Sequence, residues 1–297
     1  MKVRVGFGLG TRTDFVDERF LDLVSLLEDL RFDSLWLSER ITGPCPDPVV
    51  ALAAAAGRTQ RLKFGMSVMV LPGRNPVLVA KELATLDQLS GGRLLPAFGL
   101  GAVNPAEQQA FGVARGERAA LFDEALPLIR RLWTEDRVDH AGEHFRLEGA
   151  KVRPFPRQSP PDVWLGGIAP AELRRVGRLG DGWLPSFVTP TDAAEGRAVV
   201  ERTAADHGRE IDPEHFGVLL PYSLEPIPDE VLALLPSRRP DVDPRQLVAS
   251  GADELRDRIG EFVDVGFSKF VVVPLGDPAD PAEHLARLAD VVLPLQT

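Results

Sequence analysis

The chain contains a single cysteine, Cys45, among its 297 residues. One thiol cannot form an internal disulfide, and it cannot build a zinc site of the cysteine-rich kind. The sequence also lacks any run of about 18 or more apolar residues, the length needed to span a membrane. The opening MKVRVGFGLG has no basic region before a long apolar stretch, so no signal peptide is predicted. These absences favour a reducing compartment, the cytoplasm, and no membrane association.

An excess of positive charge is also lacking. The 34 Lys and Arg residues face 44 Asp and Glu residues, which leaves a formal net charge of -10. Such a charge repels polyanions, and no Lys- or Arg-rich stretch interleaved with aromatic residues overrides it locally. The sequence therefore excludes nucleic acid as an expected partner and leaves small molecules.

Short β-rich runs are present, and they alternate with longer amphipathic stretches. This alternation is typical of a parallel sheet built from βα units. Eight strands are predicted, at residues 3–9, 34–39, 62–71, 93–101, 162–167, 182–187, 215–222 and 268–276. Helices are predicted at residues 18–30, 47–60, 76–89, 118–133, 170–179, 191–207, 251–265 and 280–292.

Eight βα units predict one (β/α)8 barrel, a TIM barrel, which occupies residues 1–297 as a single domain. A barrel of this kind needs about 250 residues, so a second domain is not required. Two segments exceed simple connections: residues 134–161, with a small hairpin around HAGEHFRLE, and residues 223–250, rich in proline and charge. Long connections in compact domains are often functional. The first is interpreted as a rim insertion, and the second as a lid or a plain variable loop.

The strand ends, where barrel enzymes place their active sites, lack the residues of most barrel chemistries. The five histidines lie in loops, helices or at a strand start, so no metal site is predicted. Lys63 and Lys269 fall at the near ends of strands, which disfavours Schiff-base chemistry. Glu39 is the one acid placed clearly at a strand terminus, whereas glycoside hydrolysis needs two facing carboxylates.

Glycines are abundant at these strand ends and indicate that a bound cofactor carries the chemistry. Gly99 and Gly101 lie at the end of the fourth strand, where a missing side chain lets a flat ring approach the backbone. Gly166 and Gly167 precede a helix that begins near Pro170, and free amides at a helix start can bind phosphate. Glycines at such turns also serve purely steric needs, so both interpretations stay open.

Four runs carry a specific resemblance: FDSLWLSER, RLKFGMSVMVLPGRNPVLVAKELATLDQLSGGRLLPAFGLG, DVWLGG and RRVGRLGDGWLPS. They resemble the luciferase-like monooxygenase superfamily, and within it the branch of actinobacterial F420-dependent oxidoreductases. The resemblance implies an enzyme that transfers a hydride between coenzyme F420, a deazaflavin, and a small organic substrate. It also implies a homodimer.

The resemblance further implies a set of site residues. A non-prolyl cis peptide in a bulge of the third strand, which bends the ring, maps onto Ser67 and Val68. The acid and the neighbouring residue after the second strand, which lie near the reactive ring carbon, map onto Glu39 and Arg40. Contacts to the ring and to the phosphate are implied for Gly65, Gly99, Gly101, Gly166, Gly167 and Ile168, with Arg74 as a polar contact.

The sequence departs from the pattern of the related sugar-phosphate dehydrogenases at two positions. Arg40 stands where a histidine is common, and an arginine cannot act as a general base. Ala102 stands where that pattern has a glutamate. Both changes disfavour a sugar phosphate as substrate, and Arg40 suits an anionic ring or substrate instead. Two alternatives remain: an FMN-dependent monooxygenase of the same fold, and a barrel that binds a flavin or deazaflavin without catalysis.

Overall fold

Short parallel strands alternate with helices along the chain, as the sequence predicts. The computed structural model describes residues 1–234 and 239–297. Its barrel strands are β1 (Arg4–Leu9), β2 (Ser34–Leu37), β3 (Lys63–Met66), β4 (Met69–Val70), β5 (Leu94–Leu95), β6 (Ala97–Gly99), β9 (Trp164–Leu165), β10 (Gly182–Trp183), β11 (Gly217–Ser223) and β13 (Lys269–Pro274). Two of the predicted strands, residues 62–71 and 93–101, are each divided into two short pieces.

The strands close into a ring. One run of neighbours is β11, β13, β1, β2, β3 and β5, and the other is β10, β9, β6 and β4. Parallel bridges from Trp183 to Phe216 and from Ser186 to Leu219 join β10 to β11 and complete the circle. The pieces β3 and β4 together form one barrel strand, and so do β5 and β6, which gives eight strands in the ring. The predicted (β/α)8 fold is confirmed.

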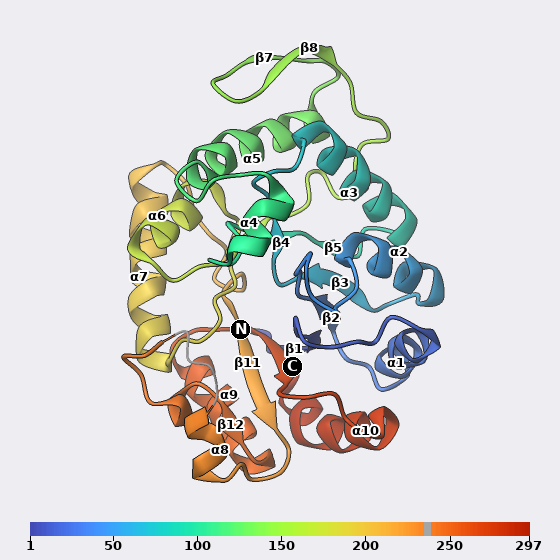
Figure 1. Ribbon diagram of the computed structural model, residues 1–297, viewed down its shortest axis with the longest axis vertical. Helices are drawn as coiled ribbons and strands as arrows, with labels where there is room; N and C mark the ends of the chain where they lie inside the picture. Colours follow the sequence, from blue (N-terminus) through green and yellow to red (C-terminus); the bar gives the residue numbers. More distant parts are fainter. Residues whose placement is uncertain (235–238) are drawn as a thin grey trace.

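The helices surround the strands (Figure 1). The eight predicted ones are α1 (Glu18–Asp29), α2 (Pro48–Arg58), α3 (Pro76–Ser90), α5 (Arg118–Thr134), α6 (Pro170–Leu179), α7 (Pro190–Asp206), α9 (Ala252–Asp264) and α10 (Pro281–Val292). Several begin at proline. Amides in the first turn of a helix have no acceptor within the helix, so proline, which lacks an amide hydrogen, loses no hydrogen bond there. In α5 the stripe Phe122, Leu126, Ile129 and Trp133 is buried against the barrel wall. None of the helices described combines the length and the apolar character of a membrane span.

The two long connections lie at different ends of the barrel. Residues 134–161 join the end of α5 to the start of β9 and contain the antiparallel hairpin of β7 (Val138–Ala141) and β8 (Arg146–Ala150), which projects from the body in Figure 1. The predicted hairpin is therefore present, but it lies away from the strand ends that form the mouth of the barrel.

The segment 223–250 follows the C-terminal end of β11 and lies at that mouth. It contains α8 (Asp229–Leu234), the 3-10 turn Pro244–Gln246 and β12 (Ala249–Ser250). Residues 235–238 of the predicted lid lie outside the described residues.

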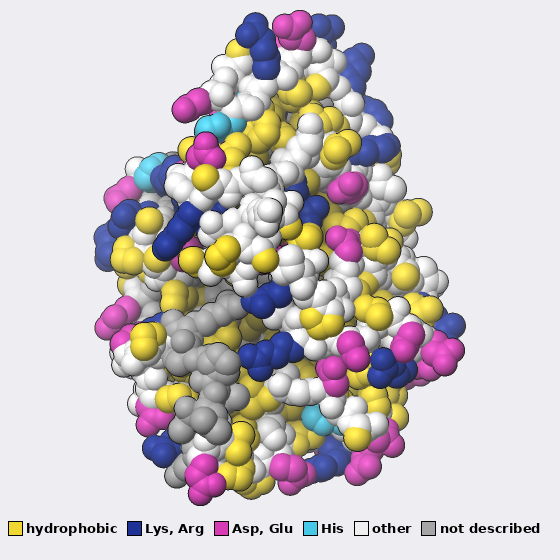
Figure 2. All heavy atoms as spheres, viewed as in Figure 1, with side chains coloured by type: hydrophobic (Ala, Val, Ile, Leu, Met, Phe, Trp, Pro, Cys, Tyr) yellow, Lys and Arg dark blue, Asp and Glu magenta, His cyan; other side chains and the backbone are white. Residues whose placement is uncertain are grey.

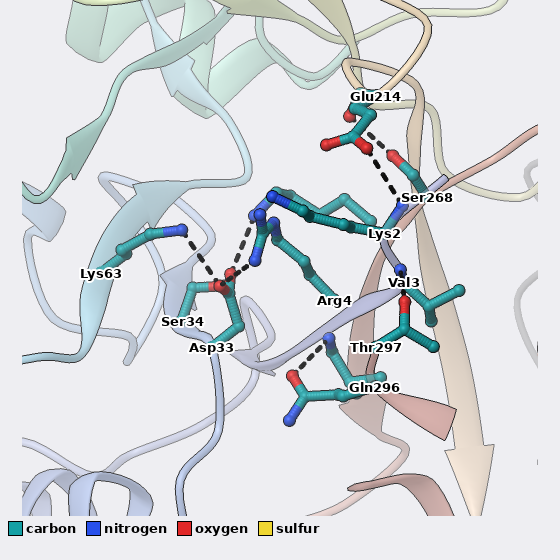
Figure 3. A network of polar contacts seen from close by, with 12 residues as sticks. Lys2, Val3, Arg4, Asp33, Ser34, Lys63, Glu214, Ser268, Gln296 and Thr297 are labelled. Carbon is teal, nitrogen blue, oxygen red and sulfur yellow. Dashed lines mark hydrogen bonds and ion pairs between the residues drawn. The ribbon is translucent and has the colours of Figure 1, made fainter. Parts of the chain in front are cut away.

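A polar network ties the strand starts together at the other end of the barrel (Figure 3). The carboxylate of Asp33 accepts from Lys63 Nζ at 3.1 Å and from Lys269 Nζ at 2.9 Å. Burial alone would raise the pKa of Asp33, but the two ammonium groups outweigh it and hold that pKa well below its ordinary value. Both lysines are thus engaged far from the mouth, in agreement with the sequence-based exclusion of Schiff-base chemistry.

Candidate active site

A cavity of about 680 Å³ opens at the C-terminal ends of the barrel strands. This is the size of a small-molecule or cofactor site and the end of the barrel where active sites are found. Near the centre of the face in Figure 2, Lys and Arg side chains lie next to recessed hydrophobic ones. The lining comes from nearly every barrel strand: Gly10, Arg12, Ser38 to Arg40, Ser67, Val68, Val70, Phe98 to Ala102, Glu107, Leu165 to Ile168, Leu184, Ser186, Phe187, Leu219 and Val273. Pro244, Leu247 and Val248 add a wall from the segment 223–250.

A bulge between β3 and β4 forms part of the floor of the cavity. The peptide bond between Ser67 and Val68 is cis, as the resemblance implied. The Ser67 carbonyl accepts from Ser38 Oγ at 3.2 Å, which joins the bulge to the end of β2. A Cβ on Gly99 would lie 2.4 Å from Val68 Cγ2, and one on Gly166 would lie 3.1 Å from Val68 Cγ1. Both glycines therefore make room for the Val68 side chain.

The carboxylate of Glu39 holds the far side of the same bulge. It accepts from the Val70 backbone amide at 2.7 Å and forms an ion pair with Arg74. The Glu39 side chain is only 2% exposed, and burial raises its pKa in spite of the Arg74 guanidinium. Arg74 also donates to the Val70 carbonyl at 2.9 Å. Glu39 lines the cavity, whereas Arg74 lies behind it and positions Glu39.

Arg40 lines the cavity one residue further on. Its side chain passes Gly43, whose added Cβ would lie 3.0 Å from Arg40 Cδ. The loop after it is fastened by Glu107, a residue of α4 (Pro105–Phe111) that sequence analysis did not identify. Glu107 is 4% exposed, and its carboxylate accepts from the amides of Ile41 at 3.2 Å and Thr42 at 2.9 Å. The capping residue Asn104 before Pro105 was the available sequence signal for this helix.

The predicted phosphate-binding amides at the start of α6 already have an acceptor. Glu172 Oε2 accepts from the amide of Ile168 at 2.9 Å and from that of Ala169 at 3.0 Å. Gly167 has φ +105°, and a Cβ there would lie 2.7 Å from the Glu172 side chain. An incoming phosphate would have to displace this carboxylate before it could bind the Ile168 amide.

Of two other predicted contacts, Gly65 lies away from the cavity and Gly101 lies in its lining. A Cβ on Gly65 would lie 2.2 Å from the Trp36 ring, so Gly65 gives space to Trp36 inside the barrel and does not line the cavity. Gly101 does line the cavity, with φ +84°, a conformation that favours glycine. The carbonyls around it, of Leu100 and Gly101, accept from the buried Arg118 at 3.0 and 3.2 Å, which fixes this loop.

The cavity offers binding surface and oriented charge. Burial raises the pKa of the nearby Cys45 thiol, which disfavours a reactive thiolate there. Within residues 1–234 and 239–297, no group of three or more His, Cys, Asp or Glu side chains is placed to hold a metal ion. The arrangement suits a bound organic cofactor whose ring rests on an apolar floor, with arginine and carboxylate groups at its edge.

The family model of luciferase-like monooxygenases matches residues 6–291 of the chain. The protein belongs to the luciferase-like monooxygenase family. A curated relative from Intrasporangium calvum, named F420-dependent glucose-6-phosphate dehydrogenase, is 30% identical over 328 residues, which cover 94% of this chain and 95% of the relative. The family predicted from the sequence is thus confirmed.

Solved structures of luciferase-like proteins share the whole fold. An F420-dependent secondary alcohol dehydrogenase in complex with an F420-acetone adduct superimposes with a TM-score of 0.85 at 20% identity and full coverage of both chains. The coenzyme F420-dependent tetrahydromethanopterin reductase of Methanopyrus kandleri superimposes with a TM-score of 0.82 at 19% identity, again over both full chains. These matches support the fold, but at about 20% identity they do not assign a substrate to this protein.

Proposed function

We propose that this protein is an F420-dependent oxidoreductase that transfers a hydride between the deazaflavin and a small organic substrate. The observation that carries the proposal is the cavity floor, where Val68 stands between Gly99 and Gly166 at the mouth of the barrel. The relatives named as F420-dependent enzymes, which match the chain over most of its length, support this choice of cofactor.

The residues present fit a flat ring. Val68, Leu184, Leu219 and Val273 provide apolar surface in the lining, and the glycines beside Val68 keep side chains from blocking it. We propose that Ser67, Val68, Gly99, Gly101, Gly166 and Gly167 hold the cofactor, with the Ile168 amide available once Glu172 moves. When bound, the deazaflavin supplies the site that gives or takes a hydride.

The chain's own contribution is position and charge. Glu39 and Arg74 hold the bulge that carries Val68, so Glu39 acts by positioning it. Arg40 lies on the cavity wall, where we propose that it contacts the reacting partner. The guanidinium keeps its proton at any ordinary pH, so Arg40 orients and stabilises negative charge and takes no proton.

Titration of the purified protein with oxidised F420, and separately with FMN, tests the cofactor by tryptophan quenching and by cofactor fluorescence. Gly99→Ala forces its new Cβ against Val68 and is expected to weaken F420 binding about tenfold or more. Gly57→Ala is the matched control, because a Cβ at Gly57 of α2 meets nothing within 4 Å. Unchanged F420 affinity in Gly99→Ala would contradict the proposed ring position.

Preference for FMN, with oxygen consumption by the reduced flavin, would instead establish the monooxygenase. Binding of F420 without turnover of any substrate by either redox form would leave a non-catalytic barrel. Binding of neither cofactor would reject the proposed function altogether.

We also propose that the protein works in the cytoplasm as a homodimer. The exposed apolar residues Val50 on α2 and Leu78 and Leu89 on α3 are 71%, 60% and 72% exposed, and they supply surface for a subunit contact. Light scattering on the eluting protein tests the assembly: twice the chain mass supports a dimer, and the mass of one chain contradicts it.

A further inference from the structure

Two arginines enter the cavity from neighbouring strand ends. Arg12 follows β1 and Arg40 follows β2, and both line the cavity. The two strands are directly paired, with Leu9 opposite Leu37, and the Ser38 amide donates to the Leu9 carbonyl at 3.1 Å. Both arginines therefore lie on the same side of the mouth.

Within the described parts of the chain neither arginine forms a salt bridge, although, against the effect of burial and together with hydrogen bonds from Thr42 and Ile41, the charge of Arg40 lowers the pKa of Glu107. The third arginine of the lining, Arg175, differs in this respect, because its Nε donates to Asp123 at 2.5 Å. The carboxylates of the lining have donors of their own: Glu39 has Arg74 and the Val70 amide. Glu107 accepts from the backbone of the loop after Arg40, and Glu172 from the start of α6.

A guanidinium presents five N–H donors in a planar fork that matches a carboxylate or a phosphate. At Arg12 and Arg40 these donors border an otherwise largely apolar cavity, so an anion on a small molecule is the group that would satisfy them. Strands β1 and β2 lie across the ring from β9, which leads to Gly166, Gly167 and Ile168, whereas the cofactor residues Ser67 and Val68 follow β3, the neighbour of β2. An anion held by these arginines therefore lies away from the Ile168 amide, the group proposed for the cofactor phosphate.

We infer that Arg40 and Arg12 select a small anionic organic substrate, whose carboxylate or phosphate pairs with their guanidinium groups while its apolar part faces the floor. The inference rests on the proposed function in taking this cavity as the substrate site. Arg40 is the specificity-determining residue of the pair, because its loop is fixed by Glu107 and its side chain is partly buried, whereas Arg12 is exposed.

The test compares matched probes: benzoate, phenyl phosphate and the neutral benzyl alcohol, titrated by calorimetry against the protein with and without F420. The anionic probes are expected to bind at least about tenfold more tightly than the alcohol, and Arg40→Met to remove about tenfold or more of that affinity. Arg40→Lys restores part of it, since it returns the charge without the fork. Comparing the affinities for benzoate and phenyl phosphate decides whether a carboxylate or a phosphate is preferred. Glucose 6-phosphate is added to the panel to test a sugar phosphate directly.

Arg202→Met, which removes an exposed arginine of α7 outside the cavity, is the control and should leave all affinities unchanged. Arg40→Met should change the melting temperature little, because among the described residues Arg40 forms no salt bridge and interacts with Glu107 only through its charge. Equal affinity for benzoate and benzyl alcohol would overturn the inference, even if F420 binds. A loss of F420 affinity alone in Arg40→Met would assign the arginine to the cofactor and also overturn it. If the anionic probes bind through Arg40 but F420 does not bind, the inference stands and the proposed function fails.

Discussion

The carboxylate of Glu172 accepts a 2.9 Å hydrogen bond from the backbone amide of Ile168, the amide that the sequence predicts will bind a cofactor phosphate. A negative charge near the start of a helix is favourable, and this one occupies the position that an anionic ligand would take. The two anions cannot share these donors, so cofactor binding is linked to the position of one side chain.

Glu172→Gln is therefore expected to tighten F420 binding. The amide oxygen of glutamine still accepts from the helix start, but the charge that repels the phosphate is gone. Removing an interaction of about 0.3–1 kcal/mol at a helix terminus corresponds to a change of about two- to fivefold in the dissociation constant. Fluorescence titration measures it, with the exposed Glu195→Gln of α7 as the control for loss of one charge. Weaker binding in Glu172→Gln would show that Glu172 supports the cofactor site.

The pair of Glu39 and Arg74 should stabilise the bulge as a unit. Breaking a buried ion pair costs about 3–5 kcal/mol, and Arg74 is 21% exposed, so the lower end of that range is expected for Glu39→Gln. Urea unfolding of the two single variants and of Glu39→Gln with Arg74→Met measures the coupling. Additive losses in the double variant would contradict a direct interaction.

Asp33, at the end of the barrel opposite the mouth, should make the free energy of unfolding depend on pH. Its pKa in the folded protein lies below the ordinary value of about 3.9, so the folded state binds fewer protons there than the unfolded state. The stabilisation is therefore fully present above about pH 5 and is lost as the pH falls through about 4 and below.

Unfolding of Asp33→Asn in urea at about pH 7, 5 and 3.5 tests this dependence. The loss relative to the unchanged protein should be about 3–5 kcal/mol at pH 7, because Lys269 is left buried without its partner, and should shrink at the lowest pH. The exposed pair of Asp253 and Arg256 provides the control, Asp253→Asn, with a loss of at most about 1 kcal/mol. If the difference in unfolding free energy between Asp33→Asn and the unchanged protein is the same at all three pH values, the lowered pKa of Asp33 is contradicted.

Glu107 should act on ligand affinity through the loop of Arg40. Glutamine has one acceptor oxygen where the carboxylate has two, so Glu107→Gln leaves at least one of the Ile41 and Thr42 amides without an acceptor. A buried donor without a partner costs about 1–3 kcal/mol of stability. We expect such a loss in urea unfolding together with weaker binding of benzoate, and neither effect in the exposed control Glu143→Gln. Full affinity in Glu107→Gln would show that the loop holds its shape without this carboxylate.

Much of the fold follows from local patterns in the sequence. Strand-like runs such as residues 268–276 and helix punctuation such as Pro76 and Gly91 depend on neighbouring residues only, so they can be identified without tertiary structure. The glycines at the end of the fourth predicted strand, Gly99 and Gly101, were recognised by the same means. The motif around Ser67 and Val68 added the site of the cis bond through family resemblance.

The sequence by itself determined the alternation of elements, the barrel and the family, because these depend on periodicity and on contiguous motifs. Only the tertiary structure decided what each polar group binds. Glu39 meets Arg74 across 35 positions and Glu107 meets Thr42 across 65, and Glu172 reaches back over Gly167 to the Ile168 amide. Such contacts exist only after the ring of strands closes and brings the strand ends to one mouth, and no local pattern encodes which charges will then be satisfied and which, as at Arg40, will face the cavity.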